Sequence, residues 1–127
     1  MQRVYVTKRF TFEAAHYLPN YNGACSDLHG HSYKLEVTVS GEPNKSKTSD
    51  KYGMVIDFKE LKMLVYDNAL IMLDHRDLNK VYKYPTAEFM VIDLYKRISE
   101  ALPNHLNLES VKLWETEDSY AEYRGEN

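Results

Sequence analysis

Alternating apolar and polar residues predict four strands along the chain. Over residues 29–40, every second position from Tyr33 onward is apolar and the positions between are polar. A two-residue period indicates a strand with one buried face. The same period over residues 3–16, around 111–116 and over 119–124 predicts three further strands.

Two segments between these strands have the spacing of amphipathic helices. Apolar residues recur every three or four positions over Phe58–Met72 and over Val91–Leu102. Asp57, followed three positions later by Glu60, is typical of a helix N-cap. A second helix is predicted to start at Thr86, which follows a proline.

The order strand, strand, helix, helix, strand, strand predicts an α+β fold. Segregated strands and helices favour an antiparallel four-stranded sheet with both helices on one face. The 127 residues are enough for one domain, which we place at 1–127. Such a sheet has two open edges, and open edges invite pairing with other subunits.

Composition and charge narrow the classes of function. The net charge is -3, which gives no bulk attraction to nucleic acid or to an anionic membrane. The single cysteine excludes an internal disulfide framework and favours a reducing compartment. We see neither a signal-peptide pattern nor an apolar run that could span a bilayer. We therefore expect a cytoplasmic protein with no nucleic-acid or membrane partner.

Three of the five histidines are expected to meet at one end of the sheet. His29 and His31 share one face at the start of a strand, and His16 ends the apolar row of the preceding strand. Antiparallel pairing places the end of the first strand beside the start of the second. Three neutral imidazoles with an open position are typical of a catalytic zinc site. The alternative is that hydrogen bonds satisfy these histidines as capping or core residues.

Other positions are candidates for chemistry, each with a plainer alternative. Cys25 is a fourth metal ligand, a buried apolar residue or a reactive thiolate. Asp74 and His75 are surface charges, or a histidine oriented by a carboxylate for proton transfer. Glu115 has the parity of the inward apolar residues on its strand. It either binds a ligand rich in N–H groups or lies at an edge open to water. His105 is expected at the surface.

These residues stand in motifs that resemble the 6-pyruvoyltetrahydropterin synthase and 6-carboxytetrahydropterin synthase family. The matching segments are Phe12–His16, Cys25 with His29-Gly30-His31, Gly53–Phe58, Leu73–Asn79, Pro85–Glu88 and Trp114–Thr116. They cover most of the chain. The three residues between Cys25 and His29 resemble the spacing of the bacterial 6-carboxytetrahydropterin synthases of queuosine and deazapurine biosynthesis.

The resemblance implies a tunnelling fold, in which strands of several subunits join into a barrel. The implied assembly is a homohexamer of two trimers, with active sites between subunits. The implied site is Zn²⁺ on His16, His29 and His31, Cys25 as proton acceptor, Asp74 and His75 as a proton relay, Glu115 on the pterin ring, and Thr86 as a further substrate contact.

The implied activity is that of a zinc-dependent carbon–carbon lyase. It converts 7,8-dihydroneopterin triphosphate to 6-carboxy-5,6,7,8-tetrahydropterin and releases acetaldehyde and triphosphate. One alternative is formation of 6-pyruvoyltetrahydropterin on the same scaffold. The other is a non-catalytic zinc- or pterin-binding module, in which Cys25 completes the metal coordination.

Overall fold

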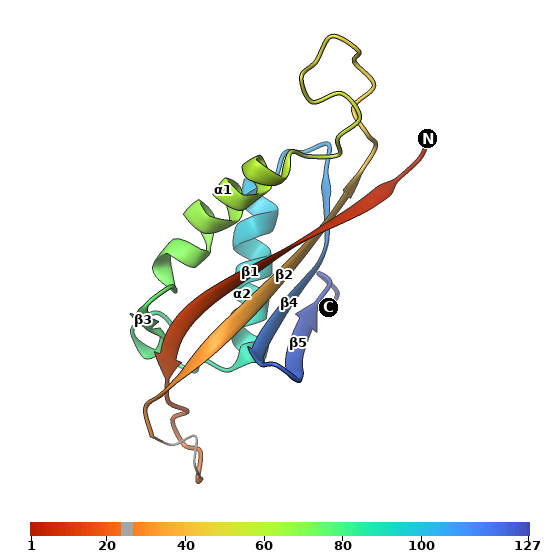
Figure 1. The fold of residues 1–127 in the computed structure, drawn as a ribbon. Coiled ribbons are helices and arrows are strands. Elements are labelled where there is room, and N and C mark those ends of the chain that lie inside the picture. The colour runs from red at the N-terminus through yellow and green to blue at the C-terminus, as the bar shows by residue number, and fades with distance from the viewer. Residues whose placement is uncertain (24–26) are drawn as a thin grey trace.

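The computed structural model describes residues 1–23 and 27–127 and is built on a five-stranded sheet (Figure 1). The order of the strands across the sheet is β3-β1-β2-β4-β5. Their bounds are β1 (Val4–His16), β2 (His29–Gly41), β3 (Arg76–Asp77), β4 (Asn107–Thr116) and β5 (Ser119–Tyr123). All neighbours are antiparallel except β3, which pairs parallel to β1.

Both α-helices lie on one side of the sheet (Figure 1). They are α1 (Phe58–Asn68) and α2 (Ala87–Ala101), with short 3₁₀ turns η2 (Leu70–Met72) and η3 (Leu78–Lys80) between them. The predicted N-caps are confirmed. The Asp57 carboxylate accepts from the Lys59 N–H at 2.9 Å, and the Thr86 hydroxyl accepts from the Phe89 N–H at 3.2 Å. Each cap satisfies a backbone donor that the helix leaves unpaired.

The core lies between the helices and the sheet face that they cover. Its fully buried members include Tyr33, Leu35, Val37, Val39, Leu61, Val65, Leu94, Ile98, Val111 and Leu113. They come from alternate positions of β2 and β4 and from the predicted helical stripes. Each large aliphatic side chain buried here contributes about 1.5–3 kcal/mol of transfer free energy.

The α+β architecture is confirmed, with two differences in detail. The sheet has a fifth strand, β3, where four antiparallel strands were predicted. Two residues are too few to show a period, so no pattern could have predicted β3. The first helix also ends at Asn68 rather than near Met72, and Phe58 at its start is 50% exposed.

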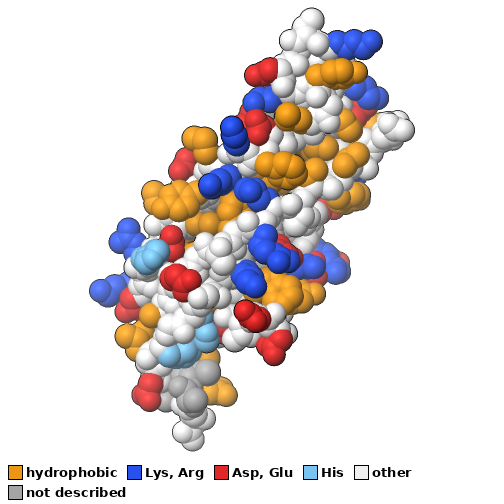
Figure 2. All heavy atoms as spheres, in the orientation of Figure 1, with side chains coloured by type: hydrophobic (Ala, Val, Ile, Leu, Met, Phe, Trp, Pro, Cys, Tyr) orange, Lys and Arg blue, Asp and Glu red, His pale blue; other side chains and the backbone are white. Residues whose placement is uncertain are grey.

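The opposite face of the sheet carries polar side chains that pair across strands. Arg9 and Glu36 form an ion pair between β1 and β2, and the Ser110 hydroxyl donates to Glu122 between β4 and β5 at 2.8 Å. Figure 2 shows Lys, Arg, Asp and Glu side chains intermingled over the molecule in this view.

Among the described residues, no helix has the length and apolar character needed to cross a membrane.

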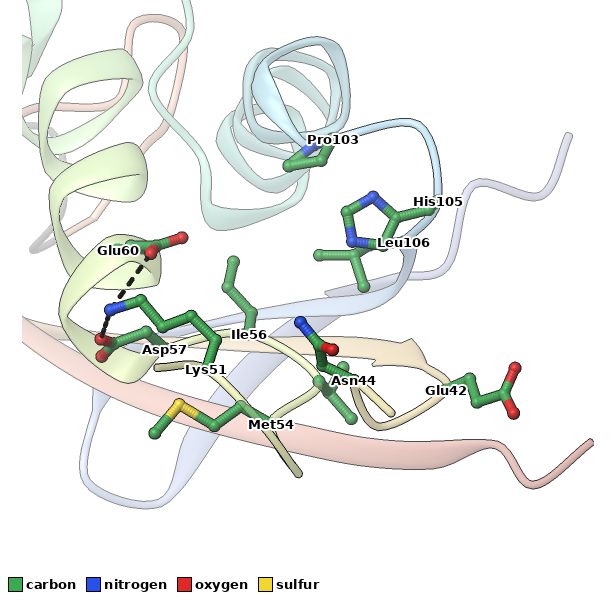
Figure 3. A pocket seen from close by; sticks show the side chains of 11 residues that line it. Glu42, Asn44, Lys51, Met54, Ile56, Asp57, Glu60, Pro103, His105 and Leu106 are labelled. Atoms are coloured by element: carbon green, nitrogen blue, oxygen red, sulfur yellow. Dashed lines mark hydrogen bonds and ion pairs between the residues drawn. The ribbon is translucent and has the colours of Figure 1, made fainter. Parts of the chain in front are cut away.

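The loop between β2 and α1 lies at the end of the sheet where β1 begins (Figure 1). With the turn before β4 it encloses a hollow of about 230 Å³ (Figure 3). Lys51 crosses the side of this hollow and pairs with Asp57 at 2.7 Å and with Glu60 at 3.6 Å. Glu60 thus pairs with a lysine of the loop and helps to fix that loop to the start of α1. His16, His29 and His31 lie at the opposite end of the sheet.

Candidate metal centre

The pairing of β1 with β2 brings the three predicted histidines together. His16 lies directly opposite His29, and Ala14, two residues before His16, lies opposite His31. The ring centroids of His29 are 4.7 Å from those of both His16 and His31, and the centroids of His16 and His31 are 5.1 Å apart. The rings meet edge to face, so the imidazoles surround a common point.

Glu115 joins this cluster from β4. Its Oε1 atom lies 2.9 Å from Nε2 of His16 and 3.4 Å from Nε2 of His31. The potential ligand atoms of the three histidines and Glu115 all lie within 4.8 Å of one another. Glu115 is therefore an inward carboxylate, one of the two options that its parity left open.

Backbone carbonyls determine which nitrogen of two histidines faces the centre. Nδ1 of His16 is 2.9 Å from the Pro85 carbonyl oxygen, and Nδ1 of His29 is 2.7 Å from the Asp27 carbonyl oxygen. A carbonyl can only accept, so each Nδ1 carries the proton. Each Nε2 is left with a lone pair. Such outer partners commonly orient metal-binding histidines and fix their tautomer.

Two buried nitrogens of the cluster have no hydrogen-bond partner among the described residues, namely Nε2 of His16 and Nε2 of His31. Both are near Glu115, but neither contact is aligned as a hydrogen bond. A buried polar atom without a partner costs about 1–3 kcal/mol. A divalent ion bonded at about 2.0–2.1 Å would satisfy both atoms. The cluster can therefore hold a metal ion.

Electrostatics within the cluster depend on Glu115. Burial alone lowers the pKa of His16, but Glu115 and the Pro85 carbonyl together raise that pKa above its usual value. The contact with His16 lowers the pKa of Glu115 despite its burial. Burial lowers the pKa of His31 and outweighs the attraction of Glu115. A metal ion needs neutral imidazoles, so its binding would displace any proton on these rings.

The Asp74–His75 pair forms the predicted dyad. Nδ1 of His75 is 3.0 Å from Oδ1 of Asp74, and the same oxygen accepts from the Glu13 N–H at 3.1 Å. The His75 backbone is left-handed, with φ of 60°, and its side chain is 77% exposed. His75 and His31 both line an open hollow of about 550 Å³. One residue of the dyad and one of the cluster thus face the same hollow, and Figure 2 shows histidines at two places in the lower half of the molecule.

Thr86 lies beside the cluster without contacting it among the described hydrogen bonds. The Thr86 hydroxyl caps α2, so the structure gives this side chain a helix-capping contact. Its neighbour Pro85 holds His16, which places Thr86 one residue from the cluster. Cys25 lies outside the described residues. His105 is exposed, as expected, and lies at the other end of the sheet.

Sequence reasoning missed the groups that hold the ligands in place. These include the carbonyls of Asp27 and Pro85, and Tyr33, whose hydroxyl lies 3.3 Å from Nδ1 of His16. Backbone carbonyls carry no signal in side-chain patterns. Tyr33 was identified only as an apolar member of β2. The contact between Glu115 and His16 could have been predicted only with the register of β2 on β4.

The chain belongs to the 6-pyruvoyl tetrahydropterin synthase family, whose model matches residues 5–126. A 6-carboxy-5,6,7,8-tetrahydropterin synthase from Haemophilus influenzae is 35% identical over 141 aligned residues, which cover 94% of this chain and 97% of that protein. A dihydroneopterin monophosphate aldolase from Pyrococcus furiosus is 39% identical over 107 residues, which cover 84% and 85%.

The fold agrees with this membership. The solved structure of Caenorhabditis elegans 6-pyruvoyl tetrahydropterin synthase superposes with a TM-score of 0.81 and 26% identity, covering 99% of this chain and 98% of that chain. The relatives thus share one scaffold and carry different reaction names.

Proposed function

We propose that the protein is a zinc-dependent lyase that acts on 7,8-dihydroneopterin triphosphate in queuosine or deazapurine biosynthesis. Its products are 6-carboxy-5,6,7,8-tetrahydropterin, acetaldehyde and triphosphate. The observation that carries this proposal is the cluster of His16, His29 and His31, one member of which, His31, lines the same hollow as His75 of the dyad. Support for the 6-carboxy product comes from the relative in Haemophilus influenzae and from the short spacing between Cys25 and His29.

The proposed metal ligands are the Nε2 atoms of His16 and His29 together with His31. Zinc bound there supplies a Lewis acid that lowers the pKa of substrate hydroxyls and stabilises developing negative charge. Three protein ligands leave one position for the substrate, which is typical of catalytic zinc. The carbonyls of Pro85 and Asp27 keep the ligand rings oriented.

The proton transfers are assigned to the chain's own side chains. We propose that the Cys25 thiolate removes the proton from the side-chain carbon next to the pterin ring. The ring accepts the electrons of that bond, which makes the proton acidic. His75 moves protons at the side-chain oxygens, and its Nδ1 atom is held by Asp74, which leaves Nε2 for the substrate.

Cleavage then has a balanced outcome. Triphosphate leaves, one water is added, and the bond between the first and second side-chain carbons breaks. The first carbon is oxidised to a carboxylate, while the ring is reduced from its dihydro to its tetrahydro form. The remaining two carbons leave as acetaldehyde.

Glu115 is the proposed anchor of the pterin ring. Its carboxylate stays ionised because its pKa is lowered, and it is only partly exposed. If the three imidazoles held zinc, the Glu115 oxygen that now contacts His16 and His31 would be free to accept from a substrate. We propose that Glu115 then accepts from the 2-amino and ring N–H groups, a charge-assisted bidentate contact. Thr86 is proposed as a second contact through its position beside Pro85.

We propose that the phosphates bind beside His75, at a second hollow. There Arg76 and Lys80 line a hollow of about 500 Å³ together with His75. Figure 2 shows Lys or Arg side chains close to a histidine at the left edge of the molecule. Lys83 instead lies 5.7 Å over the Tyr84 ring. We propose that Arg76 and Lys80 bind the triphosphate, since paired cations suit its charge.

We further propose that copies of the chain assemble edge to edge, as a homohexamer of two trimers. Among the described residues, β3 covers only Ala14 and Ala15 of the outer edge of β1. The rest of this edge, from Val4 to Phe12, and the outer edge of β5 offer backbone groups to a neighbour. Joining such edges would continue the sheet into a barrel.

The test is incubation of the zinc-loaded protein with 7,8-dihydroneopterin triphosphate, followed by mass spectrometry of the pterin and detection of aldehyde. We expect the 6-carboxy product with acetaldehyde. A 6-pyruvoyl product without acetaldehyde would support the activity named for the Caenorhabditis elegans protein. If the protein cleaves dihydroneopterin monophosphate but not the triphosphate, the result would support the activity named for the Pyrococcus furiosus relative.

Replacing Cys25 by Ala tests the proposed base in the same assay. We expect Cys25→Ala to retain zinc and to lose turnover by about 10²-fold or more, because general-base catalysis contributes about that much. Full activity in this variant would show that another group takes the proton. Sulfur in the first coordination shell, seen by X-ray absorption, would favour the non-catalytic binding module.

A further inference from the structure

The segment from Asp74 to Asn79 is fastened to the outer edge of β1. Glu13 makes the first contact, with its N–H donating to Asp74 Oδ1 at 3.1 Å and its carbonyl accepting from the His75 N–H at 2.5 Å. β3 then pairs with Ala14 and Ala15. Figure 1 shows β3 beside the end of β1, the strand whose last residue is His16.

Asn79 makes the last of these contacts. Its Oδ1 accepts from the Tyr17 N–H at 2.8 Å, and its Nδ2 donates to the Tyr17 carbonyl at 3.0 Å. Both halves of the side-chain amide are therefore used on one backbone residue. Asn79 is itself held, because its N–H donates to Oδ1 of Asp77 at 3.0 Å and this contact caps η3.

The spacing of these contacts is that of a strand pair. In a strand, every second residue directs its N–H and carbonyl toward the same neighbour. Residues 13, 15 and 17 form such a series, and the Asn79 amide meets Tyr17 as a peptide group of a neighbouring strand would. Pairing of β1 with β2 ends at His16 and His29. Tyr17 thus lies beyond the β1–β2 ladder, and Asn79 holds its backbone.

We propose that Asn79 is a positioning residue for the metal ligand His16. His16 lies between two fixed points, β3 on Ala15 and the Asn79 amide on Tyr17. With the Pro85 carbonyl on its ring, these contacts fix both the backbone and the imidazole of a side chain that is 1% exposed. The same short segment carries the Asp74–His75 dyad, so its contacts with β1 also fix the position of the dyad relative to His16. This inference rests on the proposed metal site.

Removing the amide should disturb the metal rather than substrate binding. Asn79→Ala leaves two backbone groups of Tyr17 without their partner, so the chain next to His16 can rotate. Changes in such outer contacts commonly weaken metal binding 10- to 100-fold. We expect the zinc dissociation constant of Asn79→Ala to rise by about that factor. We also expect kcat to fall while KM for the pterin stays within about twofold, since Asn79 is not placed on the substrate.

The experiment compares Asn79→Ala, Asn79→Asp and Asn68→Ala. Asn79→Asp keeps an acceptor for the Tyr17 N–H and loses the donor, so we expect a smaller loss. Asn68 is a matched control, because it lies on the exposed side of α1 and its amide donates to the Leu64 carbonyl at 2.8 Å. Zinc affinity is measured by competition with a chromophoric chelator below the unfolding temperature. The visible spectrum of the Co²⁺-loaded protein reports the ligand geometry.

A general loss of stability would lower the melting temperature without changing metal affinity or the Co²⁺ spectrum. Wild-type affinity and spectrum in Asn79→Ala would therefore overturn the positioning role. Hydrogen exchange of the Tyr17 amide in metal-free protein tests the Asn79–Tyr17 contact by itself. We expect this exchange to become faster in Asn79→Ala but not in Asn68→Ala. Unchanged exchange would overturn only the claim that Asn79 holds the Tyr17 backbone. Absence of zinc binding in the wild type would overturn the proposed function.

Discussion

At the scale of residues, the site is defined by where unsatisfied atoms point. Two buried Nε2 atoms have no hydrogen-bond partner among the described residues, while the opposite nitrogens of His16 and His29 meet backbone carbonyls. Histidines kept for packing would have both nitrogens paired, because an unpaired buried donor or acceptor is costly. The arrangement therefore fits a cation-binding site better than the alternative of satisfied core histidines.

Replacement of one ligand should remove the metal. We expect His31→Ala to bind less than about a tenth of the zinc bound by the wild type. Loss of an outer contact already weakens metal binding about 10- to 100-fold, and loss of a direct ligand should weaken it more. The measurement is elemental analysis after dialysis. His105→Ala is the control, because His105 is exposed at the other end of the sheet and should leave the zinc content unchanged. Equal zinc in both variants would contradict the site.

Much of the site could be predicted from residues alone, and the reason is geometric. The parity of His16, His29 and His31 on two consecutive strands is enough to bring them together once the strands pair. The contacts of Glu115 and Asn79 needed the structure. One depends on the register between β2 and β4, and the other on a side chain that acts as a backbone group. Neither is encoded in a spacing along the chain.

At the scale of elements, helix caps and short segments fix the ends of the long helices and strands. Thr86 starts α2 directly after the carbonyl that holds His16, so the helix start and the metal ligand are linked. Asp57 starts α1 and is held by Lys51 from the preceding loop. The strands and helices followed from apolar periods, whereas β3 did not, because its two residues owe their conformation to β1.

The Asp57 cap should make the free energy of unfolding depend on pH in the acid range. The hydrogen bond from Lys51 and the Lys59 N–H lower the pKa of Asp57 below its usual value near 3.8. A carboxyl with a lower pKa in the folded state stabilises the fold above its unfolded pKa, and this contribution is lost as the pH falls through the folded pKa. We therefore expect the cap's contribution to fade below about pH 4.

Urea unfolding at neutral and at acid pH checks this expectation. Asp57→Asn keeps a side-chain oxygen for the cap but cannot titrate, so its unfolding free energy should fall less on acidification than that of the wild type. Asp67→Asn, on the exposed side of α1, serves as the matched control and should behave like the wild type. An identical acid dependence in Asp57→Asn and the wild type would rule out this contribution of the cap.

At the scale of the whole molecule, one edge of the sheet is only partly covered. The Glu13 N–H and carbonyl point outward to Asp74 and His75, so alternate residues before it, such as Thr11, also direct their backbone groups outward. These groups do not take part in the pairing of β1 with β2. They are available to a second copy, as the proposed barrel requires.

A proline at such a position separates assembly from folding. Thr11→Pro removes an outward N–H and leaves the β1–β2 hydrogen bonds in place, so we expect a smaller assembly with similar secondary structure. Thr11→Ala keeps the N–H and should assemble like the wild type. Sedimentation velocity measures the size. An unchanged assembly in Thr11→Pro would show that β1 does not form the subunit contact.

The most direct test of the account is a zinc titration of the metal-free protein with turnover of 7,8-dihydroneopterin triphosphate as the readout. We predict that activity rises from background in proportion to added zinc and stops rising at one ion per chain, with His16, His29 and His31 as ligands. Full turnover by the metal-free protein, or activity that does not respond to zinc, would contradict it.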